Sequence, residues 1–482
     1  MRVGGEEVKG AERKPNRSGA RGLWIGTAAA ALLLVNVAIG LDRPLAESAA
    51  SGYRYWEDFG VAVRLYRGDR PAAPSAAART TDFEAAEAES ARLAIRPWQF
   101  WRTAEEGAFP GAGGSTDIRP LEDIGRARIV ALFFRLRGGI APFAPFWPAA
   151  LMAVPLMAWT GWEMSRAGLS LGAALFLFAV ATSAFVADVL PLAYSPAGFY
   201  VLALLMIVPW SVYLLGGPMT SPGVLVRAAA GGATLGLCAL CRGGTILVLP
   251  GFVAAALLAG LGPRPRPRAA LLLAVFILAA PPIAARATAG GHDFWIGLWE
   301  GFGDFDRSKG HVWSDAVAKR VARAHGVEDL RSPEGQRFFR TEVTRTIRSD
   351  PAWYAAILGR RLSATLLQTK LWGPGFRKST HPSEGAMDGY FGLTRNADVF
   401  TALGHTVEVP VPLLLCGPVL LAVACVRRHR RGGVPPVAWS VACLGAGAFA
   451  LPIAISTAGA LETEAFALVW LLAGALGAEW VR

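Results

Sequence analysis

Residues 23–41 read LWIGTAAAALLLVNVAIGL and contain no charged side chain. A helix that crosses the hydrocarbon core of a bilayer needs roughly 20 mostly apolar residues, and this stretch has that length and composition. The segment before it is rich in Arg and Lys, which predicts a cytoplasmic basic tail over residues 1–22. A cleaved signal peptide is the alternative, with Ala49 and Ala50 as small residues for cleavage, but the apolar run is longer than usual for one. We therefore expect an uncleaved first membrane span.

Apolar runs of similar length recur along the rest of the chain. They lie near residues 141–160, 168–190, 196–215, 224–240, 245–261, 269–286, 409–426, 436–456 and 464–480. Hydrophobic residues make up 53% of the 482 residues, and charged residues only 17%. Soluble domains carry about a quarter charged residues, so the composition argues against a soluble fold. The sequence predicts an all-α polytopic membrane protein with about ten transmembrane helices.

The charges of the short loops predict how these spans are oriented. Arg and Lys concentrate in the cytoplasmic loops of membrane proteins. Arginines crowd the loops 262–268 (GPRPRPR) and 426–433 (VRRHRRGG), whereas the alternate turns at 188–195 and 456–464 hold no basic residue. The amino and carboxyl termini are then both cytoplasmic. We interpret the net charge of +12 as attraction to the anionic inner leaflet and expect no nucleic-acid partner.

Two long polar segments remain outside the predicted spans, at 42–140 and 287–408. We expect both to be extracytoplasmic loops that form small, mainly helical subdomains. The chain then divides into a transmembrane module over residues 23–286, which includes the first loop, followed by the second loop. The remaining spans occupy the C-terminal part, residues 409–482.

Local signals in the second loop predict two helices, at residues 315–326 and 334–348. Asp315 and Ser332 are of the residue types that cap the start of a helix, and Gly326 is suited to the position just after its end.

An acidic pair among aromatic residues lies near the start of the first loop. Glu57 and Asp58 follow Tyr55 and Trp56 directly. The residues after the pair have the apolar spacing of a helix along the membrane surface, at Phe59, Ala62, Val63 and Tyr66. A carboxylate held by such a helix is a candidate general base. The alternative is a solvated acidic helix start that complements the helix dipole.

The second loop opens with a mixture of tryptophans, glycines and acidic residues. Aromatic rings stack on sugar rings, so His292, Trp299 and Trp313 are candidate sugar- or acceptor-binding residues, as are Tyr55 and Trp56 of the first loop. The alternative for the tryptophans is anchoring at the water–lipid boundary.

A weak metal signal lies in the same stretch. Asp304 and Asp306 form a D-x-D pair that could ligate a divalent cation, but no further carboxylates are predicted beside them.

Basic side chains gather at the other end of the second loop. A helix predicted to begin at Asp350 carries Arg360, Arg361 and Lys370 among leucines. A basic amphipathic helix on the outer leaflet holds cations at the depth of lipid phosphates, and arginine bonds phosphate with two parallel hydrogen bonds. Ordinary headgroup anchoring is the alternative. Arg242 is isolated in a predicted outer turn, where an unpaired charge is costly, and is a candidate for the same phosphate.

This arrangement resembles the GT-C superfamily of membrane glycosyltransferases, which includes protein O-mannosyltransferases and the lipid A aminoarabinose transferase. The resemblance covers about the first eight predicted spans and rests on the two long outer loops with acidic residues near the start of the first. Local similarities are Leu240-Cys241-Arg242 before Leu249-Pro250, Asp350-Pro351-Ala352-Trp353-Tyr354 through Arg360-Arg361, and Glu462 with Glu464. The order Glu57-Asp58 departs from the Asp-Glu order of the aminoarabinose branch.

The resemblance implies an inverting glycosyltransferase on the extracytoplasmic side of a bacterial inner membrane. Its donor would be a polyprenyl-phosphate-linked sugar, and its acceptor a hydroxyl of a glycan, lipid or protein. Asp58 would be the base, with Glu57 as the second choice. The donor phosphate would be bound by Arg242, Arg360, Arg361 and Lys370.

Metal dependence varies among such enzymes, so the resemblance requires no cofactor and leaves a divalent cation open. Three other functions remain as alternatives: a transporter or flippase, a ligase of lipid-linked glycans, and a non-catalytic membrane scaffold. A transporter would place charged residues at mid-membrane, where this chain has almost none.

Overall fold

The computed structural model of the protein is described here over part of the chain. The described residues are 17–41, 62, 65–66, 124–139, 147–183, 186–187, 190, 202, 205, 208, 241, 294–303, 308–312, 315–330, 332–366, 396–403, 405–410, 416–430 and 466–481. This part is mainly helical, as predicted, and contains one two-stranded sheet.

Five helices lie at positions where the sequence predicts membrane spans. They are α1 (Arg17–Leu41), α6 (Pro148–Arg166), α7 (Ser170–Thr182), α19 (Cys416–Arg430) and α21 (Phe466–Val481). Of the other five predicted spans, 196–215 is described only at Leu202, Leu205 and Val208, which are helical and buried, and the remaining four lie outside the described residues. Within that part of the chain, one helix is both long and apolar enough to cross a bilayer, Ser18–Ile39 of α1, while Ser170–Thr182 and Leu472–Val481 are shorter apolar helices. The number of membrane crossings stays a prediction.

Two predicted spans differ at their starts from the described helices. α6 begins at Pro148, directly after its N-cap residue Trp147, because proline suits the first turn of a helix; residues 141–146 of this predicted span lie outside the described residues. The span predicted from residue 409 overlaps strand β2 (His405–Pro410), and its helix begins only at Cys416. The sequence HTVEVP alternates β-branched and polar residues and ends in a proline, which favours a strand over a helix.

α1 and α6 cross at glycines, so their backbones touch. A Cβ atom at Gly22 would overlap the carbonyl oxygen of Gly161, and one at Gly26 would overlap the carbonyl oxygen of Met157. Gly22 and Gly26 are four residues apart on one helix face, the spacing that lets membrane helices approach closely. Because the contact is between backbones, no side chain can be added there without moving a helix.

We expect Gly22→Val to separate α1 from α6 and to lower the stability of the protein in detergent by about 3 kcal/mol. The measurement is the apparent melting temperature of the purified protein. Gly359→Ala in α16 is the matched control, because a Cβ at Gly359 meets open space and alanine favours a helix. Equal melting temperatures for Gly22→Val and the unmodified protein would show that the two helices do not cross at this glycine.

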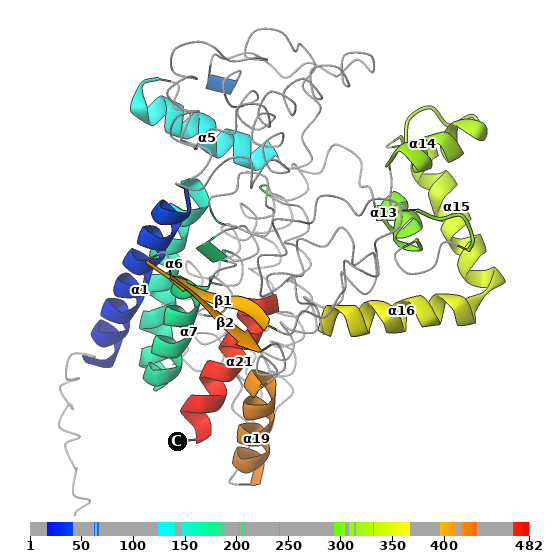
Figure 1. Ribbon diagram of the computed structural model, residues 1–482. Helices are drawn as coiled ribbons and strands as arrows, with labels where there is room; N and C mark the ends of the chain where they lie inside the picture. The colour runs from blue at the N-terminus through cyan, green and yellow to red at the C-terminus, as the bar shows by residue number, and fades with distance from the viewer. Residues whose placement is uncertain are drawn as a thin grey trace, which may run out of the picture.

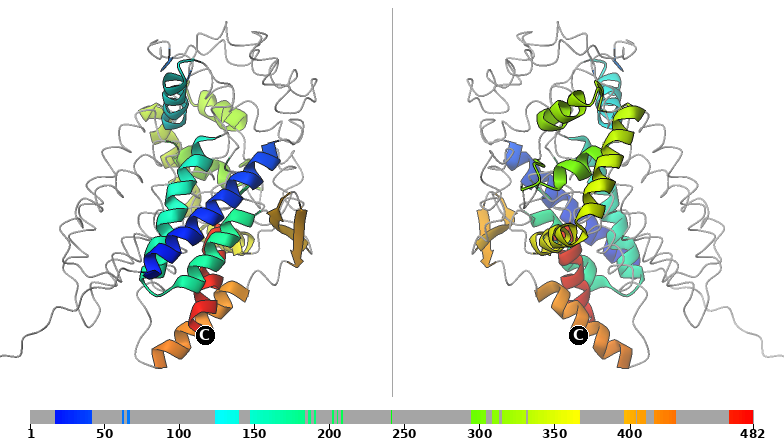
Figure 2. Two further views of the ribbon diagram at one scale, coloured as in Figure 1. Left: turned by 90° about the vertical axis from the view of Figure 1, so that its left-hand side faces the viewer. Right: turned by 90° about the vertical axis from the view of Figure 1, so that its right-hand side faces the viewer.

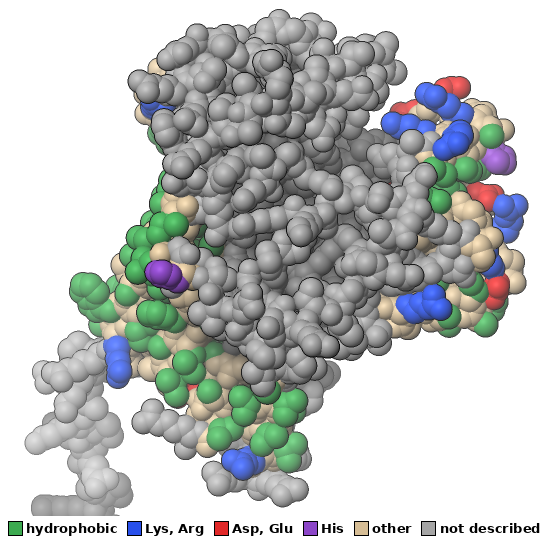
Figure 3. Space-filling view, in the orientation of Figure 1, with side chains coloured by type: hydrophobic (Ala, Val, Ile, Leu, Met, Phe, Trp, Pro, Cys, Tyr) green, Lys and Arg blue, Asp and Glu red, His purple; other side chains and the backbone are tan. Residues whose placement is uncertain are grey.

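The outward face of α1 is formed by large apolar side chains. Leu23, Trp24, Val35 and Ile39 are exposed, Trp24 by 76%, whereas the inward face is built largely from small residues such as the two glycines. The exposed faces of α7 and α19 are apolar as well, and Figure 3 shows hydrophobic side chains over this side of the molecule. A soluble protein buries large apolar residues and exposes polar ones, so the pattern is typical of helices that face lipid.

A buried asparagine connects three elements at one end of this bundle. The Nδ2 of Asn36 in α1 donates to the carbonyl oxygen of Ala181 in α7 at 2.7 Å, and its Oδ1 accepts from the backbone N–H of Leu403 at 2.9 Å. Leu403 lies between strands β1 (Asn396–Ala402) and β2, which pair antiparallel as a hairpin. The side chain therefore holds the tip of the hairpin against the ends of α1 and α7.

A carboxylate connects the carboxyl end of the chain to the start of α7. The backbone N–H of Gly172 donates to Oε2 of Glu479 in α21 at 2.6 Å, and the N-cap residue Leu169 has no side chain to do so. A carboxylate at this place also complements the helix dipole.

These contacts fix the relative directions of the five helices. α1 runs antiparallel to α6 and parallel to α7, while α21 runs antiparallel to α7 (Figures 1 and 2). α19 and α21 run parallel, because Gly474 lies against Gly417 and Gly477 against Leu421.

Four helices of the second long segment (residues 287–408) pack together as a layer apart from these five helices. They are α13 (Phe294–Gly301), α14 (Asp315–Ala324), α15 (Pro333–Ser349) and α16 (Pro351–Leu366). The two predicted helices are confirmed: Ser332 accepts a hydrogen bond from the N–H of Gly335 at 3.0 Å, and Gly326 follows α14 with φ +79°. A helix predicted from Asp350 is also confirmed: α16 is described from Pro351 to Leu366, and Lys370 lies outside the described residues.

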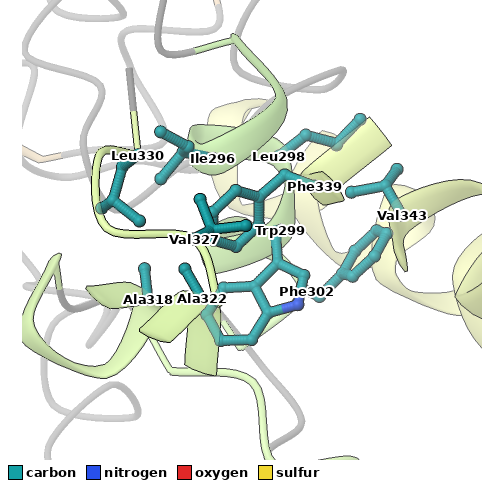
Figure 4. Packing of buried hydrophobic residues seen from close by; sticks show 10 residues of the cluster. All are labelled: Ile296, Leu298, Trp299, Phe302, Ala318, Ala322, Val327, Leu330, Phe339 and Val343. Carbon is teal, nitrogen blue, oxygen red and sulfur yellow. The ribbon is translucent and has the colours of Figure 1, made fainter. Parts of the chain in front are cut away.

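An aromatic core holds these four helices together. Its centre is formed by Trp299 and Phe302 from the α13 end and Phe339 from α15, with smaller residues of α14 closing one side (Figure 4). α16 runs across the direction of α1 and α6 rather than along it, and α15 stands nearly upright (Figures 1 and 2).

Candidate functional site

Most of the site residues predicted from the sequence lie outside the described part of the chain. These are Tyr55, Trp56, Glu57, Asp58, Arg242, His292, Asp304, Asp306, Trp313 and Lys370. Their roles stay predictions. The structure describes Trp299, Arg360 and Arg361, together with the surroundings of the first acidic pair.

The chain just after Glu57 and Asp58 rests on helix α5 (Ile124–Arg137) of the same long segment. Ala62, Leu65 and Tyr66 are helical, as the apolar spacing predicts, and Ala62 is fully buried. The ring of Tyr66 packs edge-on against Phe134 at 5.9 Å, and Nη2 of Arg135 donates to the carbonyl oxygen of Leu65 at 3.0 Å. The acidic pair is therefore followed, within a turn or two, by a segment that is fixed in place.

α5 and α14 lie at the same end of the molecule, the end at which α1 finishes (Figures 1 and 2). They belong to the first and second long segments, respectively. From α14 the second segment runs down through α15 to α16, which lies beside the bundle at the height of α1.

Arg360 and Arg361 are neighbours in α16 but differ completely in environment. Arg360 is exposed, whereas Arg361 is 0% exposed and is the largest fully buried side chain of the described residues. Arg361 follows Ile357 by one helical turn, and Ile357 follows Trp353 and Tyr354 by another, so Arg361 lies on the buried face of α16. Taking a charge out of water costs several kcal/mol unless compensating groups surround it.

A fixed, buried guanidinium is suited to binding an anion. Its planar fork binds phosphate or carboxylate in a defined orientation, and its weak hydration lowers the cost of burial relative to a lysine. Of the four cations predicted to bind a phosphate, Arg361 alone is described as buried. The sequence made both arginines of α16 candidates for the phosphate, but it could not predict their burial, which depends on how α16 packs.

A histidine is enclosed by three aromatic rings where α13 and α16 meet. The ring of His311 lies 4.9 Å from that of Trp299, 5.1 Å from Phe302 and 6.2 Å from Trp353. The side chain is 6% exposed, and among the described residues its Nδ1 has no hydrogen-bond partner. Burial, and to a smaller extent the charge of Lys309, lower the pKa of His311 from 6.5 to about 4. The imidazole is therefore neutral at physiological pH.

An ion pair fixes the start of α16 to the loop before α14. Nζ of Lys309 lies 2.9 Å from Oδ2 of Asp350 and 4.4 Å from the centre of the Trp353 ring. Oδ1 of Asp350 accepts from the backbone N–H of Trp353 at 3.0 Å, so Asp350 caps α16. The hydrogen bonds from Lys309 and Trp353 lower the pKa of Asp350.

This ion pair is a positioning element for the far end of α16. Lys309 and Asp350 are 41 residues apart, so nothing in their spacing predicts the contact. Both groups are already engaged with each other, which argues against a role as free acid or base. By holding the first turn of α16, they set where Arg361 lies three turns later.

Trp299 lies within the core rather than on a surface. It is 4% exposed, and its ring contacts His311 and Phe339. In this position it supports the subdomain. Its predicted contact with a sugar stays a prediction. No group of three or more His, Cys, Asp or Glu residues suited to a metal occurs among the described residues.

Comparison of the chain with protein-family models, with curated proteins and with solved structures finds no match.

Acidification should weaken the α13–α16 subdomain through His311. Below pH 6.5 the unfolded chain takes up a proton that the folded imidazole resists down to about pH 4, so the free energy of unfolding falls as the pH drops through this window. We expect a loss on the order of 2 kcal/mol between pH 7 and pH 4 that is reduced in His311→Phe. Melting temperatures of both proteins across this range are the measurement. Identical pH profiles would contradict the assignment.

Proposed function

We propose that the protein is a membrane glycosyltransferase of the inverting type, with a polyprenyl-phosphate-linked sugar as donor. The observation that carries the proposal is the fully buried guanidinium of Arg361, at the end of a helix that runs across the bundle. A lipid-linked phosphate needs a cation that is held near the membrane surface and shielded from water. Arg361 is that cation in this proposal, and Arg242, Arg360 and Lys370 are the further candidates.

The membrane location is supported by the surface and the directions of the helices. The exposed face of α1 is apolar, and its inward face combines glycines and alanines with Leu33, Asn36 and Val37. The alternating orientation of the predicted spans requires α1 and α7 to run outward, and α6, α19 and α21 to run inward. The relative directions observed among these five helices agree with that requirement. We place the protein in a bacterial inner membrane, with both termini cytoplasmic.

The proposed reaction uses one carboxylate and at least one guanidinium. Asp58 removes the proton of the acceptor hydroxyl, and the resulting oxygen attacks the anomeric carbon of the donor sugar. The bond from that carbon to the phosphate oxygen breaks on the opposite side, which inverts the configuration. Polyprenyl phosphate leaves with the bonding electrons, and Arg361 stabilises its added negative charge. Glu57 is the alternative base.

The proposed reaction needs the acidic pair and Arg361 at one membrane surface. The helical segment after the acidic pair lies at the end of the molecule that α14 also reaches, and α15 connects α14 to α16, which carries Arg361 at the height of α1. The donor lipid stays in the bilayer, so both groups must act at the same membrane surface.

Purified protein in liposomes, supplied with radiolabelled polyprenyl-phosphate sugars and a membrane extract as acceptor, tests the proposal. Sugar transfer with release of polyprenyl phosphate is the expected result. Movement of the lipid-linked sugar across the bilayer without transfer would indicate a flippase, and consumption of only pyrophosphate-linked glycans a ligase. Absence of all three with every sugar tested would indicate a non-catalytic scaffold.

A further inference from the structure

A row of arginines occupies the outward face of α15. Arg337, Arg340 and Arg348 are exposed, and the opposite face of the helix buries Phe339 and Val343 in the core. Among the residues that the structure describes, none of the three arginines has an ion-pair partner, whereas the neighbouring Arg345 pairs with Glu342. The row extends over 11 residues, or roughly 16 Å of helix.

Two aromatic residues, one exposed and one half-buried, lie beside this row. The guanidinium carbon of Arg340 is 5.8 Å from the centre of the Trp295 ring, and Phe294 contacts Trp295 edge-on at 5.1 Å. Phe294 is 44% exposed at the start of α13, and Trp295 is half-buried. Figure 3 shows basic side chains on the outer margin over α14, α15 and α16, away from the apolar side of the bundle.

We propose that this arginine–aromatic surface, formed by Phe294, Trp295, Arg337, Arg340 and Arg348, binds an anionic polysaccharide. Guanidinium groups bond carboxylates or phosphates with two hydrogen bonds, and aromatic rings pack against the apolar face of a sugar. A row of charges along one helix fits a polymer that repeats its negative groups, better than it fits a single ion. The inference rests on the proposed function, because it assigns the glycan acceptor to an acidic class.

The orientation of α15 favours a polymer over the membrane itself. α15 stands nearly upright beside the bundle, whereas α16 runs across it (Figures 1 and 2). A helix that binds a layer of lipid headgroups lies in the plane of the layer, as an amphipathic surface helix does. An upright row can contact that plane only at one end, so a chain-like anion is the better partner.

Binding of the full-length protein to fluorescent polygalacturonate tests the proposal. The protein is held in nanodiscs of zwitterionic lipid, with neutral dextran as the comparison polymer. We expect binding to polygalacturonate that weakens with salt, and at least tenfold weaker binding for the variant Arg337→Gln, Arg340→Gln, Arg348→Gln. Phe294→Ser should weaken binding two- to fivefold, because only part of the aromatic contact is lost.

A variant of α14 provides the matched control. Lys319→Gln, Arg320→Gln, Arg323→Gln removes the same charge from exposed positions of the neighbouring helix and should change binding less than twofold. Equal losses in the two triple variants would overturn the proposal, since they would indicate attraction to net charge alone. Binding of dextran as tightly as polygalacturonate would also overturn it. So would no binding to either polymer, or binding only to vesicles that contain phosphatidylglycerol.

The test separates this inference from the proposed function. Polygalacturonate binding that is specific to the α15 arginines supports the surface even if no sugar transfer is found. If sugar transfer is unaffected in the α15 variant and the polymer does not bind, the proposed enzyme activity stands and the proposed polysaccharide-binding surface is rejected.

Discussion

Asp58→Asn should reduce sugar transfer by about 10³-fold while leaving the protein folded, because asparagine has the shape of aspartate but cannot accept the acceptor's proton. Transfer is measured as label moved per unit of time at saturating donor. A melting temperature equal to that of the unmodified protein serves as the control for folding.

The neighbouring carboxylate provides the matched comparison. Glu57→Gln should retain most of the activity if Asp58 is the base. The reverse result, an active Asp58→Asn and an inactive Glu57→Gln, would identify Glu57 as the base. Full activity in both variants would show that neither acidic residue takes part in the reaction.

Arg361→Gln should reduce transfer by about 10²-fold, whereas Arg360→Gln should leave it within about twofold. The two residues are adjacent in α16 and carry the same charge, but only Arg361 is buried. If the guanidinium stabilises the leaving phosphate, the loss falls mainly on kcat and kcat/KM for the donor, with little effect on KM for the acceptor.

A purely structural role for Arg361 would give a different pattern. Arg361→Lys keeps the charge but loses the planar fork, and lysine costs more to bury, so we expect it to melt at a lower temperature than the unmodified protein and to stay at least tenfold less active. Recovery of full activity in Arg361→Lys would show that charge alone is needed. A lowered melting temperature together with unchanged kcat would contradict a role in the reaction.

Local features of the fold could be predicted from the sequence, because neighbouring residues determine them. Ser332 and Gly326 gave the boundaries of α15 and α14, since a hydroxyl caps a helix start and a glycine adopts positive φ after a helix end. The long apolar run of α1 was equally clear. The strand β2 was missed because an apolar run with prolines was interpreted as the beginning of a span.

Contacts between distant parts of the chain were not predictable. Asn36 binds residues of α7 and of the hairpin, and Glu479 caps a helix that begins about 300 residues earlier. The residues that flank Asn36 and Glu479 in the sequence do not indicate which residues these side chains bind. The difference between Arg360 and Arg361 is of the same kind, since one step along a helix turns a side chain by about 100° and packing decides which of the two is buried.

Accessibility of the two long segments from outside the cell tests the central claim most directly, because the proposed site can form only if both lie on the same face. Single cysteines are introduced by Arg128→Cys in α5, Arg320→Cys in α14 and Arg427→Cys at the end of α19, in a protein whose five native cysteines are replaced. All three positions are exposed. A membrane-impermeant maleimide should label the first two in intact right-side-out membranes and the third only after permeabilisation. Labelling of the α5 and α14 positions from opposite sides would contradict the account.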